Sequence, residues 1–135
     1  MRYQYLTREQ VVAIHEEVIM KYGGSEGIIS ESNIELAISR PNSVLFGYEP
    51  FRTLTEKAAV LFHDIDKLHP FVDGNKRTAY TAADIFLRLN GKKIQASTEA
   101  AVFISLETAK CSADILQVTD WINKHTSKLS KLDSP

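Results

Sequence analysis

The chain has 135 residues, close to the size of one domain, and its hydrophobic content of 44% is enough for a core without disulfides or structural metals. Its net charge of -1 does not favour a general nucleic-acid-binding or membrane-surface role, and its single cysteine excludes an internal disulfide. The first residues lack the apolar run of a signal peptide, and no stretch is apolar for long enough to span a bilayer. The sequence therefore predicts a cytoplasmic protein.

Three segments in the first half of the chain begin with a capping box and continue with apolar residues at helical spacing. The three boxes are Thr7 with Gln10, Ser32 with Glu35, and Thr53 with Glu56. The first helix is expected to end at Gly23-Gly24, the second at Pro41 and the third at about Leu68. Between the second and third helices, glycine and proline interrupt the pattern, so residues 42–52 are expected to form a loop or a short hairpin.

A fourth helix is expected from Asn75 to Asn90-Gly91, and its alanines allow neighbouring helices to approach closely, which favours a central position. After a short extended piece, two more helices are expected over 98–109 and 113–124. Six helices predict an all-α fold, a compact bundle. We assign residues 3–124 to the domain and residues 125–135 to a polar C-terminal tail.

Polar and charged side chains are concentrated in segment 69–78, at the predicted junction of a loop with a helix. A helix N-terminus offers unpaired N–H groups and partial positive charge, which with Lys76 and Arg77 make an anion site suited to phosphates. Asp73 supplies an oxygen ligand for a hard ion such as Mg²⁺. His69 titrates near neutral pH and could take the proton of an attacking hydroxyl group. These parts suit phosphoryl or nucleotidyl transfer.

Residue chemistry alone leaves a second interpretation of this segment open. Asp73-Gly74-Asn75 could be a turn followed by a helix cap, with Lys76 and Arg77 as solvated charges. The segment is not a Walker A loop, because the Gly-x-x-x-x-Gly-Lys-Ser/Thr pattern is absent.

A different catalytic interpretation starts from the dipeptide His63-Asp64, which resembles that of helical HD-type phosphohydrolases. His15 and Asp114 could complete its metal ligands. Because dipeptide motifs arise often by chance, we favour His63 and Asp64 as residues near a helix end.

The run His69-Pro70-Phe71-Val72-Asp73-Gly74-Asn75-Lys76-Arg77 resembles the motif of the Fic superfamily. Lys76 stands where the AMP-transferring branch has glycine, which is the mark of the death-on-curing (Doc) branch. The resemblance covers roughly residues 3–122. Similar strings outside the motif are Tyr22-Gly23-Gly24, Ala37-Ile38-x-Arg40-Pro41, Glu56-Lys57-Ala58-Ala59 and Phe86-Leu87-Arg88-Leu89-Asn90-Gly91.

The resemblance implies a helical domain with the motif in the loop and N-terminus between two central helices. It implies a protein kinase that uses ATP and Mg²⁺, in which Lys76 turns the nucleotide so that its γ-phosphate faces the target hydroxyl. The target that it implies is elongation factor Tu, with arrest of translation. Such proteins are toxins paired with an antitoxin chain. From its net charge, we expect this chain to bind no nucleic acid directly.

Carried onto this sequence, the resemblance makes His69 the general base and Asp73 the Mg²⁺ ligand, with His69, Lys76 and Arg77 as the catalytic set. Phe71 becomes a structural residue. The expected phosphate contacts are Gly74, Asn75, Lys76 and Arg77. The segment Val44–Arg52 becomes a target-docking flap, to which a target peptide could add a strand. Its expected docking residues are Val44, Leu45, Phe46 and Gly47.

Two alternative functions remain open at this stage. The first is transfer of AMP or another nucleotide, against which Lys76 is the only argument. The second is a catalytically weak module of the same fold that acts by binding a partner.

Overall fold

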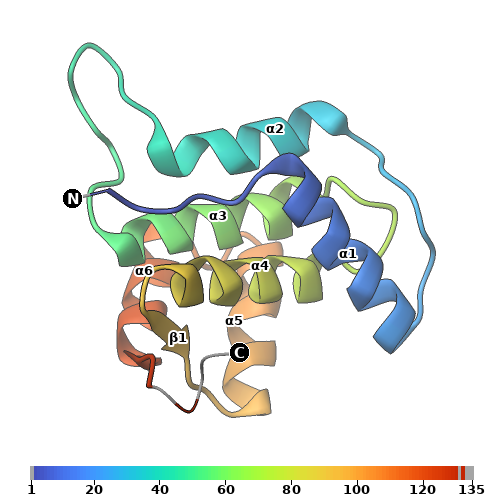
Figure 1. Cartoon of the computed structure of the whole chain (residues 1–135). Helices are drawn as coiled ribbons and strands as arrows, with labels where there is room; N and C mark the ends of the chain where they lie inside the picture. The colour runs from blue at the N-terminus through green and yellow to red at the C-terminus, as the bar shows by residue number, and fades with distance from the viewer. Residues whose placement is uncertain (1, 131, 133–135) are drawn as a thin grey trace.

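Helix α3 (Leu54–Leu68) lies at the centre of the fold, and most of its residues are buried. Our computed structural model describes residues 2–130 and 132, so residues 131 and 133–135 of the expected tail lie outside the described part. Helices α4 and α6 pack most extensively on α3, and α2 and α5 add further contacts (Figure 1). The sequence favoured the helix after the motif as the central one. That helix, α4, is the main partner of α3, and the two share the centre.

The described residues form six α-helices, one 3₁₀ helix and a two-stranded sheet, which confirms the all-α prediction. The α-helices are α1 (Arg8–Tyr22), α2 (Glu31–Ser39), α3, α4 (Asn75–Leu89), α5 (Thr98–Ala109) and α6 (Ile115–Lys124). The 3₁₀ helix η1 (Arg40–Asn42) extends α2, and strands β1 (Lys92–Ile94) and β2 (Thr126–Lys128) pair antiparallel. None of the described helices combines the length and apolar character needed to cross a membrane.

Two predicted helix starts were wrong by two residues. Helix α2 begins after Ser30, whose side chain accepts a hydrogen bond from the Asn33 N–H, so Ser30 and not Ser32 is the cap. Helix α6 begins after Asp114, which forms a capping box with Gln117. In both cases the side chain that reaches the free N–H groups sets the start of the helix.

Three residues of the expected C-terminal tail, Thr126–Lys128, are ordered as β2. They pair with β1 in the register Lys92 to Lys128 and Ile94 to Thr126. Because β1 follows directly from the end of α4, this pairing ties the segment after α6 to the central helices.

The flap, Val44–Arg52, projects from the molecule between α2 and α3, as the teal loop at the upper left of Figure 1. Leu45 and Tyr48 exchange two backbone hydrogen bonds of 2.7 and 2.8 Å, so the flap closes as a minimal hairpin. Phe46 and Gly47 form its turn, both with positive φ, as a tight hairpin turn requires.

An ion pair joins the base of the flap to the central helix. Arg40 Nη1 donates to both carboxylate oxygens of Asp64, at 2.8 and 2.9 Å, and Asp64 is 1% exposed. His63 Nδ1 lies 3.1 Å from the same carboxylate. Because Asp64 is buried, loss of Arg40 would leave a charge with poor compensation.

We expect Arg40→Ala to lower the free energy of unfolding by about 2 kcal/mol, less than a fully buried pair because the Arg40 side chain is 34% exposed. The matched control is Arg88→Ala, which breaks the surface pair with Asp84 and should cost about 0.5 kcal/mol or less. Urea unfolding followed by circular dichroism measures both. Equal losses would contradict a structural role for the Arg40–Asp64 pair.

Candidate active site

The motif loop, His69–Gly74, joins α3 to α4 and is bounded by two residues in the left-handed region. His69 ends α3 with a φ of 52°, and Gly74 precedes α4 with a φ of 73°. Left-handed backbone is costly for a residue with a side chain, and such strain is concentrated at functional sites. The chain therefore turns away from the axis of α3 at His69, and the His69 side chain lies at the surface.

Asn75 holds the motif loop closed from inside. Its side-chain Nδ2 donates to the Phe71 carbonyl oxygen at 2.9 Å, and its Oδ1 accepts from the Phe71 N–H at 3.0 Å. Asn75 is 3% exposed and Phe71 is fully buried, so these bonds satisfy two backbone groups that water cannot reach. The sequence assigned Asn75 to phosphate contact, whereas its side chain is engaged in supporting the loop.

Helix α1 supports the same loop through His15. The His15 ring stacks on Phe71 with centroids 3.8 Å apart and planes 5° apart. Its Nε2–H donates to the Asp73 carbonyl oxygen at 2.8 Å. His15 is therefore a packed histidine that supports the motif loop, and Phe71 is fully buried against its ring.

The segment between α1 and α2, residues 23–30, runs along the motif loop and is here called the strap. The N–H groups of Ile29 and Ser30 both donate to the Pro70 carbonyl, at 2.8 and 3.1 Å. The Val72 N–H donates to the Gly27 carbonyl at 3.0 Å. The loop is thus held on a second side by backbone hydrogen bonds.

Asp73 lies at the surface between the strap and α4. Its two carboxylate oxygens accept from the N–H groups of Ser25, at 3.2 Å, and Gly74, at 3.0 Å. No group of three or more His, Cys, Asp or Glu side chains in the described residues could hold a metal ion. A single carboxylate fits Mg²⁺, which is commonly held by one or two carboxylates together with substrate phosphates and water.

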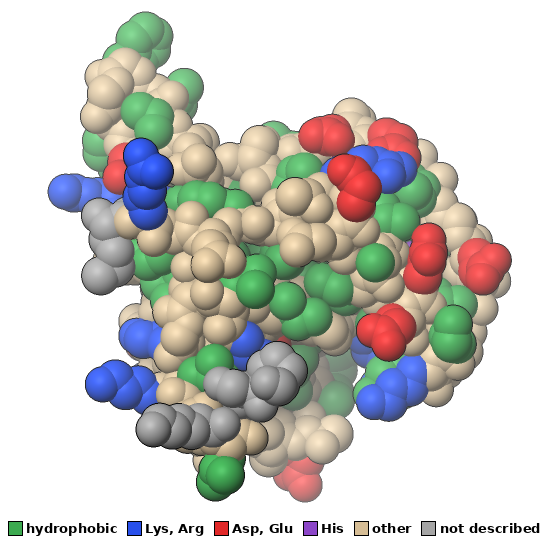
Figure 2. All heavy atoms as spheres, in the orientation of Figure 1, with side chains coloured by type: hydrophobic (Ala, Val, Ile, Leu, Met, Phe, Trp, Pro, Cys, Tyr) green, Lys and Arg blue, Asp and Glu red, His purple; other side chains and the backbone are tan. Residues whose placement is uncertain are grey.

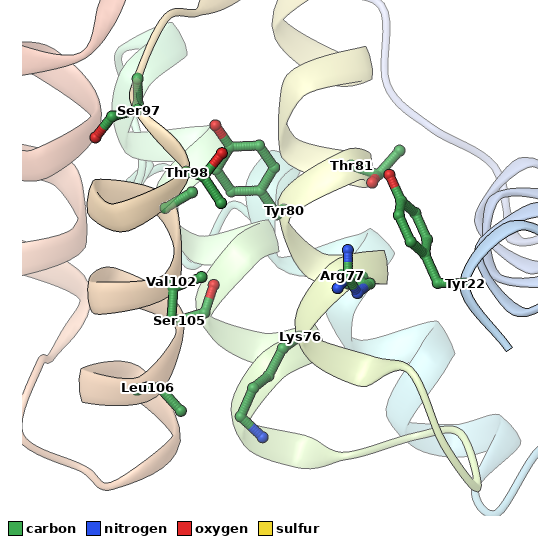
Figure 3. A pocket seen from close by; sticks show the side chains of 12 residues that line it. Tyr22, Lys76, Arg77, Tyr80, Thr81, Ser97, Thr98, Val102, Ser105 and Leu106 are labelled. Atoms are coloured by element: carbon green, nitrogen blue, oxygen red, sulfur yellow. The ribbon is translucent and has the colours of Figure 1, made fainter. Parts of the chain in front are cut away.

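The N-terminus of α4 is open to an anion, because no side chain caps the N–H groups of its first turn. Lys76 and Arg77 lie in this turn and project in different directions (Figure 3). The Arg77 guanidinium lies 3.9 Å from the centre of the Tyr22 ring, a cation–π contact that orients it.

A hollow of about 440 Å³ opens beside this turn, between α4 and α5, and we call it the α4–α5 hollow. Lys76, Arg77 and Tyr22 contribute to its wall together with Tyr80, Ser105 and Val102 (Figure 3). It therefore combines two cations, two aromatic rings and four serine or threonine hydroxyl groups next to a helix N-terminus.

Asp66 is a buried carboxyl group near the motif that the sequence analysis missed. It is 2% exposed, and neither carboxylate oxygen has a hydrogen-bond partner among the described residues. Burial raises its pKa to about 6, while the positive charges of Lys76, His63 and Lys67 oppose the rise. The signal in the sequence that could have indicated Asp66 was its position among the apolar residues of the helix that leads into the motif.

The HD interpretation finds no metal site. Asp64 is paired with Arg40, and His63 lies against Asp64. His15 is engaged with the motif loop, and Asp114 caps α6. The four residues that the HD interpretation would bring together on a metal thus take part in three separate structural contacts.

The four predicted docking residues of the flap are exposed, with Phe46 fully so and Val44 and Leu45 at 58% and 62%. None of the four predicted docking residues lines the α4–α5 hollow. Their proposed role therefore concerns a partner that approaches the flap from solvent.

Comparison with known proteins places these features in a family. Residues 5–87 match the model of the Fic/DOC family, a range that includes α1, α3, the motif loop and most of α4. The chain is 34% identical over 93 residues to "Toxin Doc" of Mycolicibacterium smegmatis, covering 69% of each chain. It is 34% identical over 98 residues to "Protein kinase doc" of Escherichia phage P1, covering 73% of this chain and 77% of that protein.

We expect Asn75→Ala to lower the free energy of unfolding by about 3 kcal/mol, because it leaves the buried N–H and C=O of Phe71 without partners. The matched control is Asn123→Ala, on the exposed face of α6, which should change stability by about 0.5 kcal/mol or less. Thermal and urea unfolding measure both variants. A loss for Asn75→Ala no larger than that of the control would show that the amide does not hold the loop.

Proposed function

The chain belongs to the Fic/DOC family, and we propose that it is a Doc-like toxin that transfers the γ-phosphate of ATP to a hydroxyl group of a protein target. The observation that carries the proposal is Lys76, a cation in the open first turn of α4 next to Arg77. The names of the two relatives, a toxin and a protein kinase, support the same reaction.

The uncapped N–H groups of α4, with Lys76 and Arg77, supply positive charge where a phosphate gains negative charge during transfer. A lysine side chain here takes up space and binds phosphate as a point charge. In the proposed orientation the γ-phosphate lies at this N-terminus, while the α4–α5 hollow is available to other parts of the nucleotide.

His69 is the proposed general base. It is exposed, and its ring has no hydrogen-bond partner among the described residues, so it can accept a proton. The hydroxyl oxygen of the target forms a bond to the γ-phosphorus, and the bond from phosphorus to the β–γ bridging oxygen breaks. The electron pair of that bond leaves with ADP, and His69 takes the hydroxyl proton.

Asp73 would hold Mg²⁺, since its carboxylate lies at the surface beside the open helix end. When bound, Mg²⁺ supplies neutralisation of phosphate charge. The hydrogen bonds from Ser25 and Gly74 fix the carboxylate in advance.

The proposed target is elongation factor Tu, whose modification would arrest translation in the cytoplasm. The proposed regulator is an antitoxin chain, since the relatives include a toxin of this family. An exposed flap edge supports docking of an extended target segment, because its tip presents unpaired apolar side chains.

We expect the intact mass of elongation factor Tu to rise by one phosphoryl group, about 80 daltons, after incubation with this protein, ATP and Mg²⁺. His69→Ala should slow the gain about 10²–10⁴-fold, the range for loss of a general base. A matched control is His125→Ala, a histidine at the end of α6 away from the motif.

A gain of AMP in place of phosphate would assign the protein to nucleotidyl transfer, and no gain would exclude this target. A His69→Ala variant with the rate of the wild type would refute the assigned base.

Lys76→Gly tests the orientation of the nucleotide. We expect phosphate transfer to fall about tenfold or more with loss of a charge-assisted contact, and AMP transfer to become detectable. Lys76→Ala is the control, because it removes the ammonium group without the backbone freedom of glycine. The two products are separated by intact mass, and an unchanged product and rate in both variants would contradict the role of Lys76.

A further inference from the structure

A second hollow, of about 530 Å³, lies at the base of the flap, and we call it the flap-base hollow. It is lined by Arg2, Tyr3, Tyr5, Asn42, Glu49 and Arg52. It shares no lining residue with the α4–α5 hollow and contains none of the motif residues. Its chemistry is therefore separate from the proposed site of transfer.

The flap-base hollow is lined by more positive than negative side chains, with Arg2 and Arg52 against Glu49. Glu49 accepts a hydrogen bond from Lys57 Nζ at 3.0 Å, and this bond holds the pKa of Glu49 below its usual range. Arg2 and Arg52 are exposed, and no hydrogen bond or ion pair joins either guanidinium to a described residue. Two guanidinium groups thus face the hollow without a hydrogen-bonded carboxylate, while Glu49 is bonded to Lys57 and also lies within the field of Arg52, whose charge helps to lower its pKa.

The buried ammonium group of Lys57 lies behind the tyrosines that line the hollow. Lys57 is 1% exposed, and its ammonium lies 5.8 Å from the centre of the Tyr3 ring and 5.5 Å from that of Tyr5. The backbone of Gln4, between these tyrosines, is bonded through both its N–H and its C=O to the Asn90 side chain at 2.9 Å. The N-terminal segment that carries Arg2 is therefore anchored beside the flap.

The flap continues from this hollow into an apolar tip. Figure 2 shows hydrophobic side chains on the projecting tip and basic side chains at its base. Phe46 and Tyr48 are exposed on the tip, whereas Asn42, Glu49 and Arg52 belong to the base. A ligand that spans both parts needs apolar groups at one end and negative charge at the other.

We propose that the flap-base hollow binds the carboxylate side chain of an extended acidic segment of the protein target. Arg2 and Arg52 would pair with the carboxylate while the flap contacts the apolar residues of the same segment. The residues that line the hollow carry two guanidinium groups and one carboxylate, a net charge of +1, so a singly charged side chain fits better than a phosphate dianion. The proposal rests on the proposed function only in taking the flap as the place where the target docks.

The test follows the Arg2 and Arg52 Nε–H signals of the full chain by nuclear magnetic resonance, without nucleotide. The probes are a capped tetrapeptide of three valines and one glutamate, its glutamine counterpart, and inorganic phosphate. We expect saturable shifts with the glutamate peptide and binding about tenfold weaker or worse with the glutamine peptide. Arg52→Gln should abolish the difference, whereas Lys92→Gln, an exposed lysine on β1, should preserve it.

Equal binding of the two peptides, tighter binding of phosphate, or no saturable shift would each overturn the proposal. Because the binding assay involves no phosphate transfer, its result tests the carboxylate site independently of the proposed kinase reaction. If the proposed reaction holds, Arg52→Gln should also raise KM for the protein target and leave kcat unchanged.

Discussion

The two hydrogen bonds between the Asn75 side chain and the Phe71 backbone determine the geometry on which the candidate site depends. They join the first residue of α4 to the middle of the motif loop, inside a region closed to water. His69 and Asp73 flank Phe71 on the same loop, so their positions relative to the α4 N-terminus follow from this pairing. The proposed phosphate site is therefore organised before any ligand binds, which lowers the cost of ordering it during a reaction.

Support from outside the motif explains why the loop keeps one conformation. The His15 ring covers Phe71 from α1, and the strap, which follows α1 directly in sequence, forms backbone hydrogen bonds to Pro70 and Val72. A loop with a left-handed residue at each end would otherwise relax. Helix α1 and the strap thus support the site although they contribute none of its proposed catalytic residues.

Local chemistry made much of the fold predictable. The capping boxes at Thr7 and Thr53 and the stop after Leu89 depend on residues a few positions apart, and the structure has them where the sequence indicated. The start of α2 was missed because Ser30 is already fixed by its N–H bond to Pro70, a tertiary contact. The buried place of Asp66 and the engaged amide of Asn75 also depend on packing between helices distant in sequence. The motif residues could be found from their types, but which of them support the loop and which face a ligand could not.

We propose that the first turn of α4 receives the γ-phosphate of ATP, and a crystal structure of the full chain with Mg²⁺ and a non-hydrolysable ATP analogue is the most direct test. We expect the γ-phosphate to lie within hydrogen-bond distance of the N–H groups of that turn, near Lys76 and Arg77, with His69 facing it. An α-phosphate in that position would contradict the proposed orientation. A nucleotide bound away from the α4 N-terminus would contradict the assignment of the site.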